Sequence, residues 1–305
     1  MDWQSEINLA AARIVPHLRV TPVLPLDLPA IGPVALKLEH LQHTGSFKAR
    51  GAVNTLVAGP VPQAGVVAAS GGNHGAAVAW AARRLGHAAR IFVPELAGPA
   101  KIALIRSQGA DLQVVPGLYG DAAAAAQAHA QATGAMQVHP YDAPATLAGQ
   151  GTLMREWEGQ GLNADTVLIA VGGGGLIGGA LAWLGGRRRV VAVEPELAPT
   201  LNRALAEGPD VTVTVGGIAA NALGASRIGR LCYDLSVAQG VQSVLVTDDA
   251  IRLAQQMLWD SLRQWVEPAG ATALAALLSG AYVPAPTERV AVLVCGANPD
   301  PAPHA

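Results

Sequence analysis

The sequence predicts an α/β protein in which mostly parallel sheets are covered on both faces by helices. Short, nearly continuous apolar runs rich in β-branched residues alternate with longer Ala- and Leu-rich runs of helical periodicity. Glycine follows many of the helical runs, and Ser, Thr or Asp precedes some of them, as expected at helix ends. The chain has 305 residues, 51% of them apolar, which is enough to bury a substantial core.

The expected elements follow this alternation along the chain. The first is a surface helix, because Ile7, Ala11, Ile14 and Val15 recur at helical spacing. Strands are expected at the β-branched apolar runs 35–38, 66–69, 90–93, 113–115, 137–139, 166–171, 190–193 and 290–294. Helices are expected between them at 74–85, 100–107, 122–133, 144–158, 176–184, 248–264 and 269–279.

Capping residues support several of these helix boundaries. Gly86, Gly109 and Gly134 close the first three helices of the alternation, where a left-handed residue is common. Thr247 precedes the helix that begins at Asp248, and acidic residues in its first turn complement the helix dipole.

The composition excludes several classes of protein. Charged residues make up 14% of the chain and the formal net charge is −2, which leaves no electrostatic footprint for nucleic acid. The longest basic run, 187–189, is interpreted as a solvated turn. Cys232 and Cys295 form no C-x-x-C pair, and no secretory leader is evident, so two reduced thiols in a cytoplasmic protein are expected.

Residues 167–186 contain no charged residue and have the length of a membrane span, which needs about 20 apolar residues. Eight of these positions are glycine, four of them consecutive. Each glycine costs a helix interior about 1 kcal/mol relative to alanine. A buried strand at 167–171, a glycine loop and a helix from Leu176 are therefore expected, and no membrane partner.

Three expected strands end in unusual loops, and ligands of parallel sheets bind beyond the carboxyl ends of strands. These loops are Ser70–His74, Gly172–Gly175 and Cys295–Asn298. A glycine run at a helix start lets backbone N–H groups surround an anion, although a tight turn with close packing is the alternative. No Lys-Ser/Thr pair follows the four glycines, which excludes the ATP P-loop pattern.

Lys48 is one of only three lysines, with Lys37 and Lys101. Small and hydroxyl residues precede it, which indicates a helix start with Lys48 in the first turn. The helix dipole there disfavours an ammonium group and favours an amine nucleophile. A solvated surface lysine is the alternative, and the residue pattern alone does not decide between them.

The segment from Lys37 to Ala52 resembles the K-x-E-x-x-Q-x-T-G-S-F-K-x-R-G-A signature of the serine/threonine dehydratases. These are pyridoxal-phosphate enzymes of the tryptophan-synthase-β-like fold, fold type II. Further matches occur in the family's order and span nearly the whole chain: the loop 70–74, Gly149-Gln150-Gly151-Thr152, the glycines 172–175, Glu267-Pro268 and the loop 295–298.

The resemblance implies a two-lobed α/β enzyme with two open, twisted, mostly parallel sheets and the cofactor between the lobes. Residues 65–143 would form a small lobe, inserted into a large lobe made of 1–64 and 144–305. A homodimer is also expected, because relatives are usually dimers.

The resemblance also implies a role for each matched residue. Lys48 would be the catalytic Schiff-base lysine, and Phe47 would pack beside the cofactor ring. Cys295 would face the ring nitrogen as a neutral thiol, and Glu267 would either cap a helix or line the cleft. The phosphate would bind Gly172, Gly173, Gly174, Gly175 and the Leu176 amide. Asn73 would bind the ring hydroxyl, and the substrate carboxylate would bind Ser70, Gly71, Gly72, Asn73 and His74.

The implied reaction is β-elimination of a β-hydroxy amino acid such as L-threonine or L-serine, giving a 2-oxo acid and ammonia. One alternative is a related lyase or racemase for another β-substituted amino acid, such as 3-hydroxyaspartate or serine. Family racemases carry an acid/base serine where this chain has Gly71, which argues against racemisation. A dinucleotide-binding protein that uses the glycine loop is a second alternative.

Two further features are left open by the sequence. Some relatives bind a divalent cation through a Glu, a backbone carbonyl and an Asp. Glu194 matches the Glu, but Thr200 stands where the Asp is expected, so Glu194 is only a candidate ligand and no metal site is assigned. The residues that admit the β-substituent are expected near Tyr119, Ala143 and Asn221.

Overall fold

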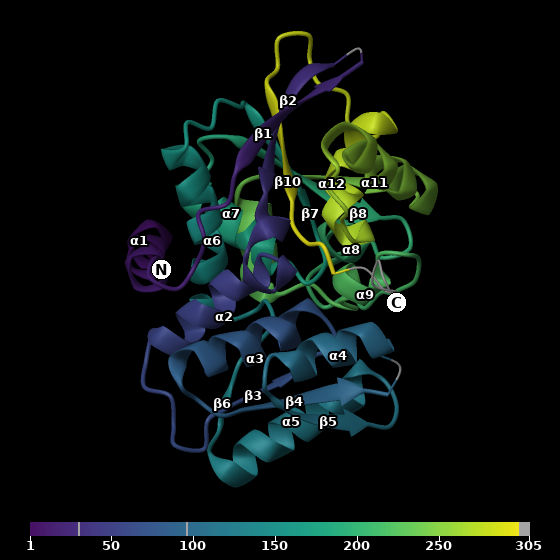
Figure 1. The fold of residues 1–305 in the computed structure, drawn as a ribbon. Coiled ribbons are helices and arrows are strands. Elements are labelled where there is room, and N and C mark those ends of the chain that lie inside the picture. The colour runs from purple at the N-terminus through teal and green to yellow at the C-terminus, as the bar shows by residue number, and fades with distance from the viewer. Residues whose placement is uncertain (30, 96, 299–305) are drawn as a thin grey trace.

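The computed structural model describes residues 1–29, 31–95 and 97–298, which form two sheets surrounded by helices (Figure 1). The strands are β1 (Val23–Leu28), β2 (Gly32–Leu38), β3 (Val66–Ala69), β4 (Ala89–Pro94), β5 (Asp111–Val115), β6 (Met136–Gln137), β7 (Thr166–Ala170), β8 (Arg189–Pro195), β9 (Gln242–Val246) and β10 (Val290–Val294). The helices are α1 (Trp3–Ile14), α2 (Lys48–Val57), α3 (Asn73–Leu85), α4 (Pro99–Ser107), α5 (Tyr119–Thr133), α6 (Pro144–Gly159), α7 (Gly175–Leu184), α8 (Thr200–Glu207), α9 (Ala220–Leu223), α10 (Arg230–Ala238), α11 (Asp248–Leu262) and α12 (Pro268–Leu278).

The strand order confirms the α/β fold class with mostly parallel sheets. The 6-stranded sheet has the order β1-β2-β10-β7-β8-β9, and only β1 runs antiparallel to its neighbour. The 4-stranded sheet, β5-β4-β3-β6, is wholly parallel. All five residues of both β7 and β10 are buried, as expected for central strands covered on both faces.

The 4-stranded sheet is formed by one continuous part of the chain, 66–137, and the 6-stranded sheet by the segments before and after it. Figure 1 shows α3 and α4 on the face of the smaller sheet that is turned toward the larger sheet, and α5 on its other face. The carboxyl ends of β3 and β10 and the start of α2 therefore lie near the junction of the two parts.

The expected helices and strands are found, with small shifts at their ends, and five elements were not expected: β1, β9, α8, α9 and α10. β1 and β9 are the edge strands of the larger sheet. They are partly exposed and lack a continuous apolar run, so the sequence pattern does not predict them. The expected strand at 137–139 is wrong in its bounds, since β6 is Met136–Gln137. Val15 is 69% exposed and lies just past α1, so it does not belong to the buried face of that helix.

The glycine-rich segment 167–186 folds as β7, a glycine turn and α7, as the sequence predicts. Within residues 1–29, 31–95 and 97–298, no helix has both the length and the apolar character needed to cross a bilayer.

Candidate active site

The loop that carries Lys48 is bonded to the loop that follows β10. Two left-handed residues, Thr44 (φ 64°) and Gly45 (φ 73°), turn the chain into α2, whose first residue is Lys48. The Asn298 side chain donates to Thr44 O at 2.7 Å, and Ala297 N donates to Gly45 O at 2.8 Å. These hydrogen bonds fix the start of α2 against the end of β10.

Lys48 is partly buried and points toward the loop after β6. Its Nζ donates to Pro140 O at 2.7 Å and lies 5.1 Å from the centre of the Phe47 ring. Burial lowers the pKa of this amine to about 8, because removal from water disfavours the ammonium form. This position does not agree with the alternative of a solvated surface lysine.

The glycines after β7 have no room for side chains. A Cβ on Gly172 would lie 2.9 Å from Leu223 Cα, and one on Gly174 would lie 2.6 Å from Cys232 Sγ. Gly174 also has φ +92°, which L side chains rarely adopt. The backbone of this turn at the start of α7, followed by Leu176, is therefore kept free of side chains and suits a bound anion.

Tyr141 brings Lys48 and this glycine turn together. Its ring packs so closely on Gly173 that no Cβ fits there, and its Cα would lie 2.9 Å from a Cβ on Gly175. Tyr141 directly follows Pro140, the residue that accepts the Lys48 hydrogen bond. Two loops far apart in the sequence thus face the same place.

The Ser70–His74 loop leads into α3, which begins at Asn73. Gly72 N donates to Ser70 Oγ at 3.1 Å, and His74 Nε2 bonds Val138 O at 2.9 Å. Burial and the charge of Lys48 lower the pKa of His74 to about 3, so its ring is neutral. The positive end of the α3 dipole is available here for a carboxylate.

Asn73 is held from both sides by residues of other elements. Its Nδ2 donates to Glu267 Oε1 at 2.5 Å, and its Oδ1 accepts from Asn298 Nδ2 at 2.8 Å. Glu267 precedes α12 without a side-chain capping bond, which disagrees with the first of its two expected roles. Burial raises the pKa of Glu267 to about 7, partly offset by the charge of Lys101.

Cys295 directly follows β10 beside these groups. Its Sγ donates to Ala269 O at 3.4 Å, and its carbonyl accepts from Phe47 N at 3.2 Å. Burial, and then the charge of Glu267, raise the pKa of the thiol well above its ordinary value. The thiol is therefore neutral.

The structure brings together the lysine loop, the glycine turn, the Ser70–His74 loop, Glu267 and Cys295. Sequence reasoning did not assign Pro140 or Tyr141 to the site, and it named Asn298 only as the end of a candidate loop, without a role. A signal for the first two exists, because they follow an expected strand just as the other site loops do. The segment around Pro140 and Tyr141 contains no glycine run, so it does not stand out in the sequence.

Glu194 is buried at the end of β8, away from any set of metal ligands. Its carboxylate accepts from Leu201 N at 2.6 Å, Asn202 N at 2.8 Å and Ser243 Oγ at 2.9 Å. Thr200 Oγ1 donates to Ala225 O at 2.7 Å. Over the described part of the chain, no three His, Cys, Asp or Glu side chains are grouped as a metal ion would require. The Glu194 carboxylate thus bonds three protein donors, and Glu194 stays only a candidate ligand.

Comparison with known proteins agrees with this arrangement. Residues 14–296 match the model of the family described as pyridoxal-phosphate dependent enzyme. Phenylserine dehydratase of Ralstonia pickettii is 38% identical over 300 residues, covering 95% of this chain and 91% of the relative. L-threonine ammonia-lyase of Geobacter sulfurreducens is 35% identical over 269 residues, covering 87% of this chain and 67% of the relative.

Solved structures show the same fold. Maize serine racemase superposes with a TM-score of 0.91 at 31% identity, covering 98% of this chain and 94% of the other. The threonine deaminase from T.th. superposes with a TM-score of 0.90 at 34% identity, covering 98% of this chain and 99% of the other. The chain therefore belongs to the pyridoxal-phosphate dependent enzyme family of fold type II.

Proposed function

We propose that this enzyme catalyses the β-elimination of a β-hydroxy amino acid such as L-threonine or L-serine, giving a 2-oxo acid and ammonia. The observation that carries the proposal is that Lys48, a partly buried amine, bonds Pro140 O, and that the next residue, Tyr141, packs on the side-chain-free glycine turn at the start of α7. The dehydratase and ammonia-lyase activities in the names of the two relatives above support the reaction class.

The residues present fit pyridoxal phosphate. The glycine turn, where a Cβ would collide with Leu223, Tyr141 or Cys232, would hold the phosphate together with the Leu176 amide. Lys48 would hold the aldehyde carbon, and Phe47 would lie beside the ring. When bound, the cofactor supplies an electron sink that makes the Cα–H bond of an amino acid easier to ionise.

Cys295 would face the ring nitrogen, and Asn73 would bind the ring hydroxyl. The Cys295 thiol is neutral and offers no charge to a ring nitrogen, which moderates the electron demand and suits elimination. The Asn73 amide is oriented by Glu267 and Asn298, so a ring hydroxyl would meet a group already fixed in place.

The Ser70–His74 loop would bind the substrate carboxylate. The amides at the start of α3 and the helix dipole favour a negative group there. His74 is neutral and bonded to Val138 O, so its role is to hold the loop rather than to supply charge. A carboxylate fixed at this place would orient the substrate.

Lys48 would move the Cα proton. An amine whose pKa is about 8 is partly in its base form near neutral pH, which is the range in which a general base works best. General acid–base catalysis of this kind contributes about 10²–10⁴-fold to the rate.

The surroundings of Gly71 favour the lyase over the racemase alternative. A racemase needs a second acid/base group on the opposite face of the substrate, and glycine offers no proton. A Cβ on Gly71 would lie only 2.6 Å from Ala97 Cβ, so a serine at this position has no room without movement of the chain around Ala97.

Three further properties belong to this proposal. The lobes would comprise 65–143 and, for the larger one, 1–64 with 144–305, as the continuous 66–137 sheet suggests. The enzyme would be a cytoplasmic homodimer acting on a small amino acid. Light scattering coupled to size-exclusion chromatography tests the dimer by its mass.

A single end-point assay tests the proposed function. Purified enzyme with pyridoxal phosphate is incubated with L-threonine, L-serine, phenylserine and 3-hydroxyaspartate, and both ammonia and 2-oxo acid are measured. We expect equal amounts of the two products from at least one of the first three substrates. Turnover of 3-hydroxyaspartate alone, or inversion of configuration without ammonia, would favour the alternative activities.

A further inference from the structure

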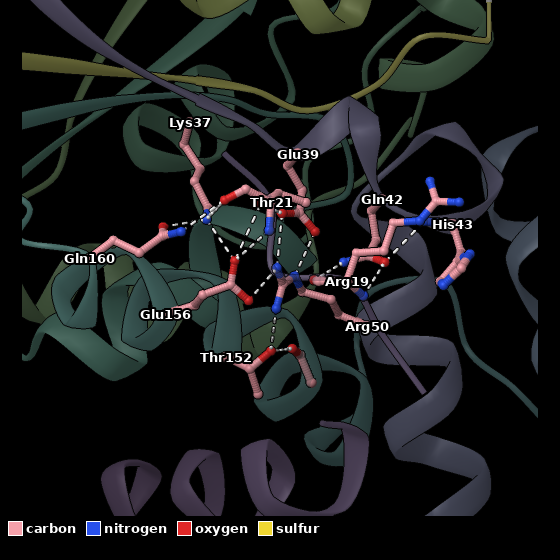
Figure 2. A network of polar contacts seen from close by, with 11 residues as sticks. Arg19, Thr21, Lys37, Glu39, Gln42, His43, Arg50, Thr152, Glu156 and Gln160 are labelled. Atoms are coloured by element: carbon pink, nitrogen blue, oxygen red, sulfur yellow. Dashed lines mark hydrogen bonds and ion pairs between the residues drawn. The ribbon is translucent and has the colours of Figure 1, made fainter. Parts of the chain in front are cut away.

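Seven polar residues, five of them buried, form a network beside α2 that the proposed function does not use. We call it the Arg50 network (Figure 2). It joins the segment before β1, the end of β2, the first turn of α2 and the second half of α6, through residues Thr21, Lys37, Glu39, Arg50, Thr152, Glu156 and Gln160. Two cations and two carboxylates balance each other within it.

Arg50 is the centre of the network, and its planar guanidinium group is held on three sides. Nε donates to Glu39 Oε1 at 2.5 Å and Nη2 to Glu39 Oε2 at 3.0 Å, which is a bidentate pair. Nη2 also donates to Glu156 Oε2 at 2.9 Å, and Nη1 donates to Thr152 Oγ1 at 3.4 Å. The Arg50 side chain is 3% exposed, so this geometry is shielded from solvent.

Lys37 completes the network from β2. Its Nζ donates to Glu156 Oε1 at 2.6 Å, Gln160 Oε1 at 2.6 Å and Thr21 O at 2.8 Å. An ammonium group has three hydrogens, so each of them has an acceptor. Glu156 is thereby fixed by a second cation and holds its other oxygen toward Arg50.

The network acts on the helix turn that carries Lys48. Arg50 follows Lys48 by two residues, and successive residues of an α-helix are turned by about 100° around its axis. The two side chains therefore leave α2 on roughly opposite sides, Lys48 toward Pro140 and Arg50 into the network. A guanidinium group fixed in a plane opposes both rotation of α2 and sliding along its axis.

Stability alone does not explain a group of four charges, three of them buried and the fourth, Glu156, with a side chain only 17% exposed. Replacing a buried ion pair by apolar residues of similar volume is often neutral or stabilising, by about 1–4 kcal/mol. What a bidentate pair adds over apolar packing is direction, because its hydrogen bonds fix angles as well as distances. Catalytic groups need that precision, since they must be held within about 10–20° of their productive geometry.

We propose that the Arg50 network positions Lys48: Arg50, held by Glu39 and Glu156, sets the rotation of α2 and thereby the direction of the Lys48 amine. This inference rests on the proposed function only for the reaction that Lys48 carries out. Arg50 touches neither the Lys48 amine nor the glycine turn in any contact of the described structure, so it is a positioning residue.

The experiment compares Arg50→Lys, which keeps the charge and loses the planar fork, with the native holoenzyme. The matched control is Arg203→Lys, at an exposed arginine that pairs with Glu207 on α8. We expect Arg50→Lys to load cofactor fully but to lose about 10–100-fold in kcat, with KM changed less than about threefold, because misplacement by about 1 Å costs up to 10²-fold. The control keeps native kcat and KM.

A second readout does not depend on the substrate. The rate at which apoenzyme captures pyridoxal phosphate, followed by visible absorbance, reports the direction and freedom of the Lys48 amine. We expect this rate to fall about tenfold in Arg50→Lys and to stay native in the control. If native enzyme turned over no β-hydroxy amino acid, the proposed function would fail, and the capture rate would still decide on the positioning role.

Two results would overturn the positioning role. One is a folded, fully loaded Arg50→Lys enzyme whose kcat and capture rate are within about twofold of native. The other is a failure to fold. If Arg50→Lys does not fold, Glu39→Gln is tested in its place, because it keeps the shape of the Glu39 side chain and removes only its charge. The same losses in kcat and capture rate are expected from it. Failure of both variants to fold would assign the network to stability instead.

Discussion

Lys48 Nζ donates a 2.7 Å hydrogen bond to the carbonyl oxygen of Pro140, the residue directly before the tyrosine that packs on the glycine turn. This hydrogen bond and the packing of Tyr141 thus connect the amine at the start of α2 with the glycine turn at the start of α7. The dinucleotide-binding alternative gives no reason for an amine at this place, whereas a cofactor with an aldehyde at one end and a phosphate at the other does.

The glycine turn should not tolerate a side chain at Gly174. Gly174→Ala places a methyl group 2.6 Å from Cys232 Sγ and forces a left-handed alanine, which together cost about 2–4 kcal/mol of folding stability. We expect a lower melting temperature and at least tenfold weaker binding of pyridoxal phosphate, measured by calorimetric titration. Gly186→Ala is the control, since Gly186 also has positive φ (+80°) but no atom within 4 Å of its Cβ position. Equal effects of the two variants on cofactor binding would argue against the turn as the phosphate site.

The pKa of Lys48 predicts how cofactor capture depends on pH. Only the uncharged amine attacks an aldehyde, and its fraction grows about tenfold per pH unit below the pKa. With a pKa of about 8, the rate of capture by apoenzyme should rise from pH 6 to 8 and then level off. Free Nα-acetyl-lysine is the reference, whose rate should keep rising. A capture rate that also continues to rise through pH 10 would show an unperturbed amine.

Glu267 should make folding stability depend on pH in a defined direction. Its pKa is raised to about 7 in the folded state, so the folded protein holds an extra proton between the unfolded value of 4.5 and 7. The stability that this proton contributes is full below pH 4.5 and is lost as pH rises through 7. Glu267→Gln keeps an acceptor for Asn73 and removes the titration, so its melting temperature relative to native should increase from pH 5 to pH 8. The corresponding change in the free energy of unfolding, relative to native, is at most about 3 kcal/mol. A melting-temperature difference that stays constant from pH 5 to pH 8 would refute the raised pKa of Glu267.

The space beside Gly71 predicts that racemisation cannot be introduced by one substitution. Gly71→Ser should lower the melting temperature and raise KM, because its Cβ meets Ala97, at a cost of about 1–3 kcal/mol. The double variant with Ala97→Gly should recover most of that stability. A double-mutant cycle of melting temperatures measures the coupling, and chiral chromatography of remaining serine measures racemisation. Additive effects of the two substitutions would show that residues 71 and 97 do not meet.

The sequence predicts the parts of this fold and site that depend on local pattern. Lys48 at a helix start and the glycine turn before Leu176 are both found where the capping and glycine signals indicate them. The buried central strands β7 and β10 are equally clear, because they are apolar along their whole length. The edge strand β9 is half-exposed and has no such pattern, so the sequence does not predict it.

Contacts between distant segments could not be predicted in this way. Nothing local to Asn298 shows that its amide bridges Thr44 and Asn73, since that depends on how the loop after β10 meets two other loops. Two alternatives for Glu267 were likewise open, because residue type at a helix start suits both a cap and a cleft carboxylate. The bond from Asn73 to Glu267 joins residues 194 positions apart, so no local pattern could have predicted it.

The most direct test of the site is to find the lysine that holds the cofactor. The chain contains only Lys37, Lys48 and Lys101, so borohydride reduction of the holoenzyme followed by peptide mass mapping gives an unambiguous answer. We expect the reduced cofactor on Lys48 alone, and we expect Lys48→Ala to lose both the visible absorbance of the bound cofactor and all turnover. Label on Lys37 or Lys101, or turnover by Lys48→Ala, would contradict the assignment of this amine.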